Sequence, residues 1–164
     1  SDPGDDKETL KFYNDEPQTW TGAEVELEVT FTFLCDYADN TGGKLTAVGI
    51  GFDTIYATAV PATHRSFYAV ISLRFSSVEV GTKGIGVRLV DADGHDIVPA
   101  IDQQLNVAPP PPGYTYRNLR VVFGLSEVRF ENFGDYAVVW LVNGQEASRV
   151  PLKVAEPPQA PTTV

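Results

Sequence analysis

Cysteine is almost absent from this chain, because Cys35 is the only one among 164 residues. An intramolecular disulfide is therefore impossible, which fits a reducing compartment. Histidine is also scarce, and a zinc site built from His64, His95 and one cysteine would need help from carboxylates. No apolar run approaches about 18 residues, and no basic, apolar and small-residue pattern opens the chain. We therefore expect neither a membrane span nor a signal peptide, and a cytoplasmic or virion-associated location.

Basic residues are outnumbered by acidic ones. The formal net charge is −10, from 22 acidic residues against 12 lysines and arginines. Residues 1–28 hold nine acidic residues and two lysines, so most of the negative charge belongs to the N-terminal part. Phosphate backbones and anionic lipids both attract basic surfaces, so this charge argues against nucleic acid and membranes as partners.

Helical periodicity is missing throughout, and a period of two replaces it. In residues 24–34 one side of an extended chain would carry Val25, Leu27, Val29, Phe31 and Phe33. The other side would carry Glu24, Glu26, Glu28, Thr30 and Thr32. Side chains of a strand alternate between two faces, so this stretch predicts a strand with one buried and one wet face.

Turn chemistry separates the other predicted strands. They are expected at residues 45–51, 52–58, 67–75, 84–90, 97–107, 119–123, 136–142 and 148–154. Residues 36–44 read as a polar turn, and Asn143-Gly144 predicts a hairpin because both positions accept positive φ. Pro109–Pro112 predicts a stiff crossover between sheets, and Tyr136 resembles a tyrosine corner.

This pattern predicts an all-β fold. We expect an antiparallel β-sandwich of immunoglobulin-like or related topology, with a jelly roll or closed barrel as the alternative. We divide the chain into an acidic N-terminal arm (residues 1–22), the sandwich domain (23–154) and a Pro-rich C-terminal tail (155–164).

Four segments in a fixed order carry a resemblance to a known family. They read FLCDYADNTGGKLTAVGIG, RLVDADGHDI, VAPPPPG and GDYAVVWLVNGQ. Together they resemble a family of uncharacterised single-domain bacterial proteins, common in actinobacteria, over about residues 29–154. The resemblance implies one β-sandwich and implies no activity, because the family has no assigned function. Residues 1–22 depart from its pattern, since its members usually begin close to the first strand.

The clearest candidate for a cation site is DADGHD, which carries Asp91, Asp93 and Asp96. Carboxylate oxygens are calcium ligands, but the EF-hand spacing and its closing acidic residue are missing. Asp93-Gly94 also suits a tight hairpin turn, and we favour the turn. We expect no cofactor.

Catalytic patterns are weak. A Cys35 nucleophile would need a base and an orienting group, and nothing in the spacing brings His64 to it. By alternation Cys35 falls on the wet face of its strand, where a neighbouring loop could still cover it. There is no serine elbow and no phosphate-binding loop. The sequence therefore predicts that the chain is not an enzyme.

Candidate contact residues fall into three groups. The arm carries Phe12, Tyr13 and Trp20, which could pack on their own domain or on a neighbouring subunit. The acidic row Glu24, Glu26 and Glu28 could keep an edge strand from pairing, or dock a basic partner. Tyr114 and Tyr116 follow the prolines and could form an aromatic or sugar-stacking patch, although we favour a structural crossover.

These observations favour a non-enzymatic interaction protein that recognises a protein partner or a second copy of itself. It would be a subunit of a larger assembly, joined through extended termini, and a decoration subunit of a phage or capsid shell is one assembly that would suit it. The alternative is a ligand-binding module for carbohydrate or calcium.

Overall fold

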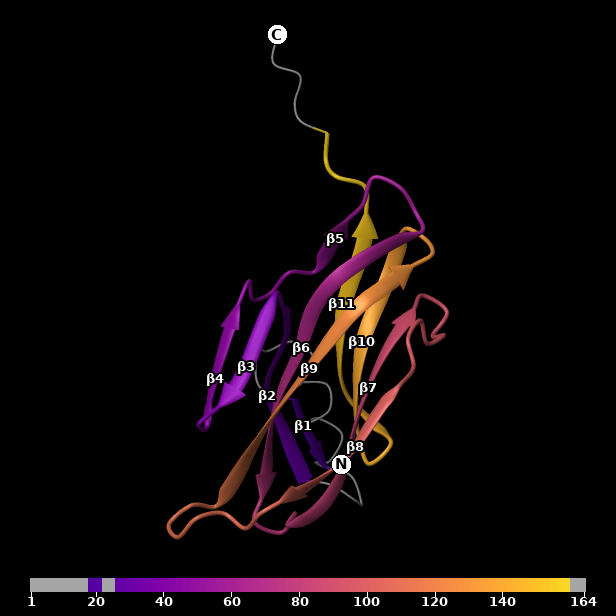
Figure 1. Ribbon diagram of the computed structural model, residues 1–164. Helices are drawn as coiled ribbons and strands as arrows, with labels where there is room; N and C mark the ends of the chain where they lie inside the picture. The colour runs from indigo at the N-terminus through magenta and orange to yellow at the C-terminus, as the bar shows by residue number, and fades with distance from the viewer. Residues whose placement is uncertain (1–17, 22–25, 160–164) are drawn as a thin grey trace, which may run out of the picture.

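The computed structural model of the chain describes residues 18–21 and 26–159, which form strands and loops (Figure 1). The strands are β1 (Gln18–Thr21), β2 (Glu26–Cys35), β3 (Tyr37–Thr41), β4 (Lys44–Val48), β5 (Thr54–Tyr56), β6 (Ala62–Ser76), β7 (Gly81–Asp91), β8 (Ile101–Val107), β9 (Tyr116–Phe130), β10 (Gly134–Val142) and β11 (Gln145–Ala155).

Two sheets face each other and a hairpin accompanies them. The first sheet has the order β1-β2-β6-β9, and the second has the order β5-β11-β10-β7-β8. Strands β3 and β4 form the separate hairpin. Neighbouring strands run antiparallel, except that β5 lies parallel to β11. The prediction of an all-β sandwich is confirmed.

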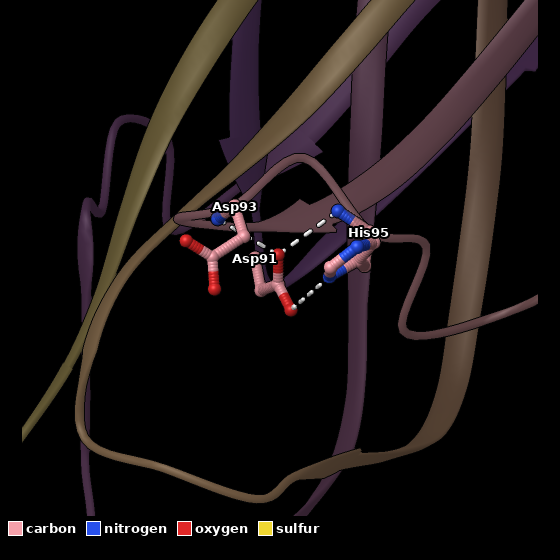
Figure 2. A group of neighbouring side chains, drawn as sticks. All are labelled: Asp91, Asp93 and His95. Atoms are coloured by element: carbon pink, nitrogen blue, oxygen red, sulfur yellow. Dashed lines mark hydrogen bonds and ion pairs between the residues drawn. The ribbon is translucent and has the colours of Figure 1, made fainter.

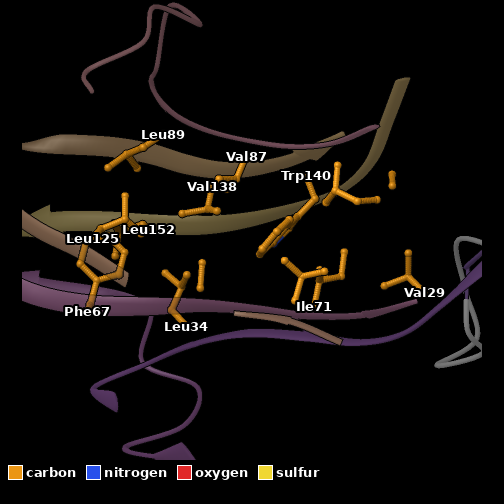
Figure 3. Close-up of a cluster of buried hydrophobic side chains, with 14 of the residues drawn as sticks. Val29, Leu34, Phe67, Ile71, Val87, Leu89, Leu125, Val138, Trp140 and Leu152 are labelled. Atoms are coloured by element: carbon orange, nitrogen blue, oxygen red, sulfur yellow. The ribbon is translucent and has the colours of Figure 1, made fainter. Parts of the chain in front are cut away.

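The core lies between the two sheets, with Trp140 at its centre (Figure 3). The predicted alternation in β6 is confirmed, because its inward side chains are all fully buried: Phe67, Ala69, Ile71, Leu73 and Phe75. Burial of large apolar side chains stabilises a sheet pair by roughly 1.5–3 kcal/mol for each one. This core therefore holds the two sheets together.

Strand β2 contains a bulge that reverses its faces. Leu27 and Val29 are buried in the core, but the register against β6 shifts between Val29 and Phe31. An extra residue at this point turns every later side chain to the opposite face. Leu34 is therefore fully buried, whereas Phe31 is 38% exposed and stacks on Phe33. The prediction that Phe31 and Phe33 face the core together with Val29 is wrong.

The predicted polar turn at residues 36–44 is mostly strand. Tyr37–Thr41 forms β3 and pairs with β4, and the turn is only Gly42-Gly43, at φ 65° and 73°. The hairpin lies against the outward side of the first sheet, where Ala38 packs on Cys35 and Val70. It also reaches the edge strand β9, because Arg120 donates from Nη1 to the Gly43 carbonyl at 3.1 Å. Cys35 is thus covered, as its place beside a loop suggested.

Residues 18–21, which the sequence placed in the arm, form a strand of the first sheet. Gln18 pairs with Val29, and Thr21 pairs with Glu26. This part of the arm therefore belongs to the sandwich, because β2 offers it a free edge. The rest of the predicted arm, including Phe12 and Tyr13, lies outside the described residues.

The predicted tyrosine corner is confirmed. The Tyr136 hydroxyl donates to the Asn132 carbonyl at 2.7 Å, and its ring meets Phe130 edge to face at 4.9 Å. The predicted hairpin is also present, since Asn143 and Gly144 both have positive φ between β10 and β11. These two features fix both ends of β10.

Candidate functional site

The turn after β7 holds the group of side chains best arranged to bind an ion. Gly94 donates from its backbone N–H to the Asp91 carbonyl at 3.0 Å, and the Asp91 N–H donates to the His95 carbonyl at 2.9 Å. These bonds confirm that DADGHD is a turn. Gly94 has φ 83°, a conformation that suits glycine at the end of such a turn.

Side-chain oxygens and a histidine converge at this turn (Figure 2). Potential ligand atoms of Asp91, Asp93 and His95 lie within 4.8 Å of one another. The Asp91 Oδ1 already accepts the backbone N–H groups of Asp93 and His95, both at 2.9 Å, and Oδ2 lies 3.7 Å from His95 Nδ1. The Asp91 carboxylate therefore already stabilises the turn, and a bound cation would share that carboxylate with the two backbone N–H groups.

Electrostatics at the turn favour a charged Asp91. The N–H groups of His95 and Asp93 hold the pKa of Asp91 below its ordinary value. The third predicted carboxylate points elsewhere, because Asp96 accepts a hydrogen bond from Arg88 Nε at 2.8 Å. The structure thus replaces Asp96 by His95 in the candidate group, a residue that carboxylate spacing alone did not indicate.

An open groove of about 400 Å³ lies beside the turn on the second sheet. It is lined by Asp91, Ala92, Asp135, Tyr136, Ala137, Arg149 and Pro151. Its cationic group is already engaged, because Arg149 donates to Glu146 from Nη2 at 2.7 Å and from Nε at 3.0 Å. The carboxylate of Asp135 is paired as well, because Lys153 Nζ lies 4.0 Å from its Oδ1.

The aromatic pair after the prolines is a second candidate. Tyr114 is 61% exposed, and its ring meets that of Tyr116 at 6.5 Å with an angle of 84°. Tyr116 is half-buried, and the Arg74 guanidinium lies 4.2 Å from its ring centroid. Two perpendicular rings form no flat platform, so this pair does not favour stacking on a sugar.

The acidic row is not on a free edge where the structure describes it. Glu28 lies in β2 between β1 and β6, and its carboxylate is 3.9 Å from Arg74 Nη1. The interpretation that Glu28 protects an edge strand from pairing is therefore wrong. The side chains of Glu26 and Trp20, and all of Glu24, lie outside the described residues.

Cys35 and His64 do not form a catalytic pair. Cys35 pairs with Tyr68 on β6, and His64 lies four positions further along that strand, roughly 13 Å away. Burial raises the pKa of the Cys35 thiol, and the charge of Asp36 raises it further. His64 instead packs near the ring of Phe67 at 5.8 Å. The thiol is therefore a buried, uncharged group.

Sequence reasoning missed a group of exposed apolar side chains beside the β3–β4 hairpin. We call Phe31, Tyr37, Val48 and Ile50 the hairpin patch; they are 38%, 50%, 58% and 59% exposed. Tyr37 and Val48 are cross-strand neighbours, and the N–H of Gly51, next to Ile50, bonds to the Leu34 carbonyl at 2.8 Å. Phe31 stacks on Phe33, which packs against the buried cluster of Cys35, Ala38 and Val70 beneath the hairpin. The bulge in β2 is what brings Phe31 outward, and no sequence signal marks it.

Two solved structures resemble this chain weakly. A beta-glucosidase from Listeria innocua, in complex with isofagomine, matches with a TM-score of 0.47 and 11% identity, covering 83% of this chain and 17% of that chain. The alkylpurine DNA glycosylase AlkC from Pseudomonas fluorescens, bound to DNA with an abasic site analog, matches with a TM-score of 0.46 and 14% identity. There the coverage is 81% of this chain and 31% of that chain, so this chain spans less than a third of either protein.

These neighbours correct one prediction. Both proteins are enzymes, so the prediction that this chain is not an enzyme is contradicted and we do not keep it. At such identity and TM-score the likeness assigns no activity to this chain.

Across the described ranges no helix is long and apolar enough to cross a membrane. No curated protein matches the chain in sequence.

A family model matches residues 30–155, nearly the range over which the sequence resembles an uncharacterised single-domain family. This match covers most of the chain, and it begins within β2 and ends with β11. The chain therefore belongs to DUF6941, a family of unknown function.

Proposed function

We propose that this domain works through protein–protein contact as a component of a larger assembly. The observation that supports the proposal is the hairpin patch, whose large apolar side chains are exposed on and beside the β3–β4 hairpin. Contiguous exposed apolar side chains rimmed by polar residues are typical of interaction sites. Tyrosine and phenylalanine, which the patch contains, are enriched in the centres of protein interfaces.

The low net charge of the domain outside residues 1–28 favours contact through apolar side chains. Most of the negative charge lies in residues 1–28, so the rest of the domain carries little net charge to steer an oppositely charged partner. The partner that suits the patch is a protein surface with its own apolar side chains. Residues 1–17, with Phe12 and Tyr13, would add contact area in such an assembly, although they lie outside the described residues.

The order of strands supports a finer proposal about the fold. We propose that the sandwich is immunoglobulin-like, because β2, β6 and β9 form one sheet while β7, β10 and β11 form the other. The tyrosine corner before β10 is a second feature of that class.

The test of the interaction proposal uses two variants of the full chain. The first carries Tyr37→Ser, Val48→Thr and Ile50→Thr in the hairpin patch. The control carries Val78→Thr and Tyr114→Ser, which are 75% and 61% exposed and lie at the crossovers. Wild type and both variants are immobilised, and proteins from the source cells are captured, identified and purified.

Support requires a purified partner that binds wild type and the control alike but binds the patch variant about tenfold or more weakly. If every captured protein binds all three forms equally, the patch is not a contact surface and the proposal fails.

A second candidate function is the binding of a divalent cation at Asp91, Asp93 and His95. The observation that favours it is the convergence of three potential ligand atoms within 4.8 Å. A bound cation would raise the unfolding temperature of wild type but not of Asp93→Asn. A flat response to millimolar calcium, zinc and EDTA in thermal-shift measurements would remove this candidate.

A further inference from the structure

The two sheets have four edges, and three of them are short or obstructed. β5 is only three residues long, and β1 is only four. β9 contains a residue with positive φ, Glu127, and is tied to the hairpin by Arg120. Short strands, irregular backbone and covering segments are the ways in which proteins prevent edges from pairing with other chains.

The edge formed by β8 has none of these protections. The strand is seven residues long, reads IDQQLNV, and contains no proline, lysine or arginine. It has no residue with positive φ, and its register against β7 is unbroken. Within residues 18–21 and 26–159, β8 pairs only with β7. Its outer side therefore presents hydrogen-bonding groups that could accept another strand.

The neighbouring turn shows which groups of β8 face outward. Gly84 donates its N–H to Asn143 Oδ1 at 2.9 Å, and its carbonyl accepts the Asn143 N–H at 2.8 Å. Both backbone groups of Gly84 thus point toward β10, away from β8. Gln104 is opposite Gly84, so this pair exchanges no hydrogen bonds and the N–H and C=O of Gln104 point to the free edge.

Alternation extends this conclusion along the strand. Backbone groups of a strand point alternately to its two sides, so those of Asp102 and Asn106 also face outward. The free groups are therefore those of residues 102, 104 and 106, spaced symmetrically about Gln104.

We propose that two copies of this chain join edge to edge through β8, antiparallel about a twofold axis at Gln104. Gln104 would then face Gln104 of the second copy, and Asp102 would face Asn106. Because these residues all direct their N–H and C=O outward, each pair exchanges two hydrogen bonds. The two five-stranded sheets become one continuous sheet, and the interface is isologous.

Side chains suit a second copy in this register. Asp102 is the only charge on β8, and the twofold places it opposite Asn106 rather than opposite another aspartate. On the inner side, the half-buried Ile101 and Leu105 already pack on the core. The second copy brings Val107 opposite Ile101 and Gln103 opposite Leu105, which adds burial to both apolar side chains.

The first test is the solution mass and the hydrogen exchange of the full chain. Light scattering is measured over a concentration series that reaches about 1 mM, so that a dimer with a dissociation constant as weak as about 1 mM would be detected. We expect a dimer, and we expect the amides of Asp102, Gln104 and Asn106 to become protected as it forms. The amides of Gln103 and Leu105 face β7 and should be protected at every concentration.

Variants then test the register. Gln104→Pro removes an outward N–H without breaking the ladder to β7, and should weaken the dimer about tenfold or more. Asn106→Asp places two carboxylates opposite each other and should also weaken it, whereas Asn106→Lys should tighten it several-fold. Thr46→Asp, on an exposed position of β4, is the control and should change nothing. Circular dichroism confirms that each variant is folded.

A chain that stays monomeric throughout the concentration series overturns the proposal. A dimer whose affinity is unchanged by Gln104→Pro also overturns it, and so does a dimer whose affinity changes in the same direction in Asn106→Asp and Asn106→Lys. The proposal fails as well if β8 pairs only with a different protein. The proposal does not rest on the hairpin patch, because the residues changed in the two tests do not overlap.

Discussion

The bulge in β2 leads to a prediction that reverses the simple alternation of the sequence. Alternation puts Phe31 on the buried face with Val29. The structure has the opposite arrangement after the bulge, with Leu34 fully buried and Phe31 38% exposed. Leu34→Ala should therefore cost about 2–5 kcal/mol of unfolding free energy, the usual cost of a cavity in a closed core.

Phe31→Ala should cost much less. Its main described partner is Phe33, with the ring centroids 5.9 Å apart, and such a pair contributes about 0.5–1.5 kcal/mol. The exposed part of the ring gains nothing from burial. We therefore expect a loss of about 1 kcal/mol.

Urea unfolding separates the two variants. A slope of about 2 kcal/mol per molar urea converts these losses into midpoint shifts of roughly 1–2.5 M for Leu34→Ala and about 0.5 M for Phe31→Ala. Leu73→Ala, fully buried under either interpretation, provides the reference for a core cavity. If Phe31→Ala proves as costly as Leu73→Ala while Leu34→Ala is tolerated, the bulge and the face reversal are wrong.

Three further predictions concern single groups. Tyr136→Phe should lose about 1–2 kcal/mol in urea unfolding, because the carbonyl that accepted its hydroxyl loses its partner; Tyr114→Phe is the exposed control, and equal losses would refute the corner. The buried, uncharged thiol of Cys35 should react with a disulfide reagent at least about a hundredfold more slowly in the native chain than in urea, and equal rates would show that the hairpin does not cover it. Because the pKa of Asp91 is lowered in the folded chain, its stabilisation is present above the unfolded pKa of about 4 and is lost as the pH falls through the lowered value. The stability gap between wild type and Asp91→Asn should therefore close in acid, and a gap that stays constant from about pH 7 to pH 2 would contradict this.

The elements that sequence predicts well are those whose signal is local. Alternation in β6 identifies Phe67 and Leu73 as core residues, because nothing interrupts its period. Asn143 and Gly144 specify a turn through their own backbone preferences. Tyr136 is identified by its place at the start of an apolar strand, and its hydroxyl bonds to the Asn132 carbonyl as predicted.

The elements that sequence misses depend on contacts between distant segments. The bulge after Val29 arises in the pairing of β2 with β6, and neither strand carries a residue that marks it. Residues 37–41 look like a polar loop because only Ala38 on β3 is buried, against Cys35 and Val70. A one-sided hairpin that covers another sheet carries too few apolar residues to be recognised alone.

The candidate site shows the same division. Carboxylate spacing indicates the turn at Asp91 and Asp93, but the choice of His95 over Asp96 depends on Arg88 in β7. The hairpin patch and the β8 edge cannot be predicted from composition, because each is a surface that no other described segment covers. Tertiary structure decides exposure, and exposure decides which residues are free to bind.

The parallel pairing of β5 with β11 determines when this chain can finish folding on a ribosome. Thr54 pairs with Lys153, about a hundred positions later, so β5 emerges long before its partner has been translated. At about 5–20 residues per second this delay lasts about 5–20 seconds. During that interval the second sheet is incomplete, and Ile55 lacks the neighbour that it meets in Val154. The nascent chain is then a natural substrate for chaperones that hold unpaired strands.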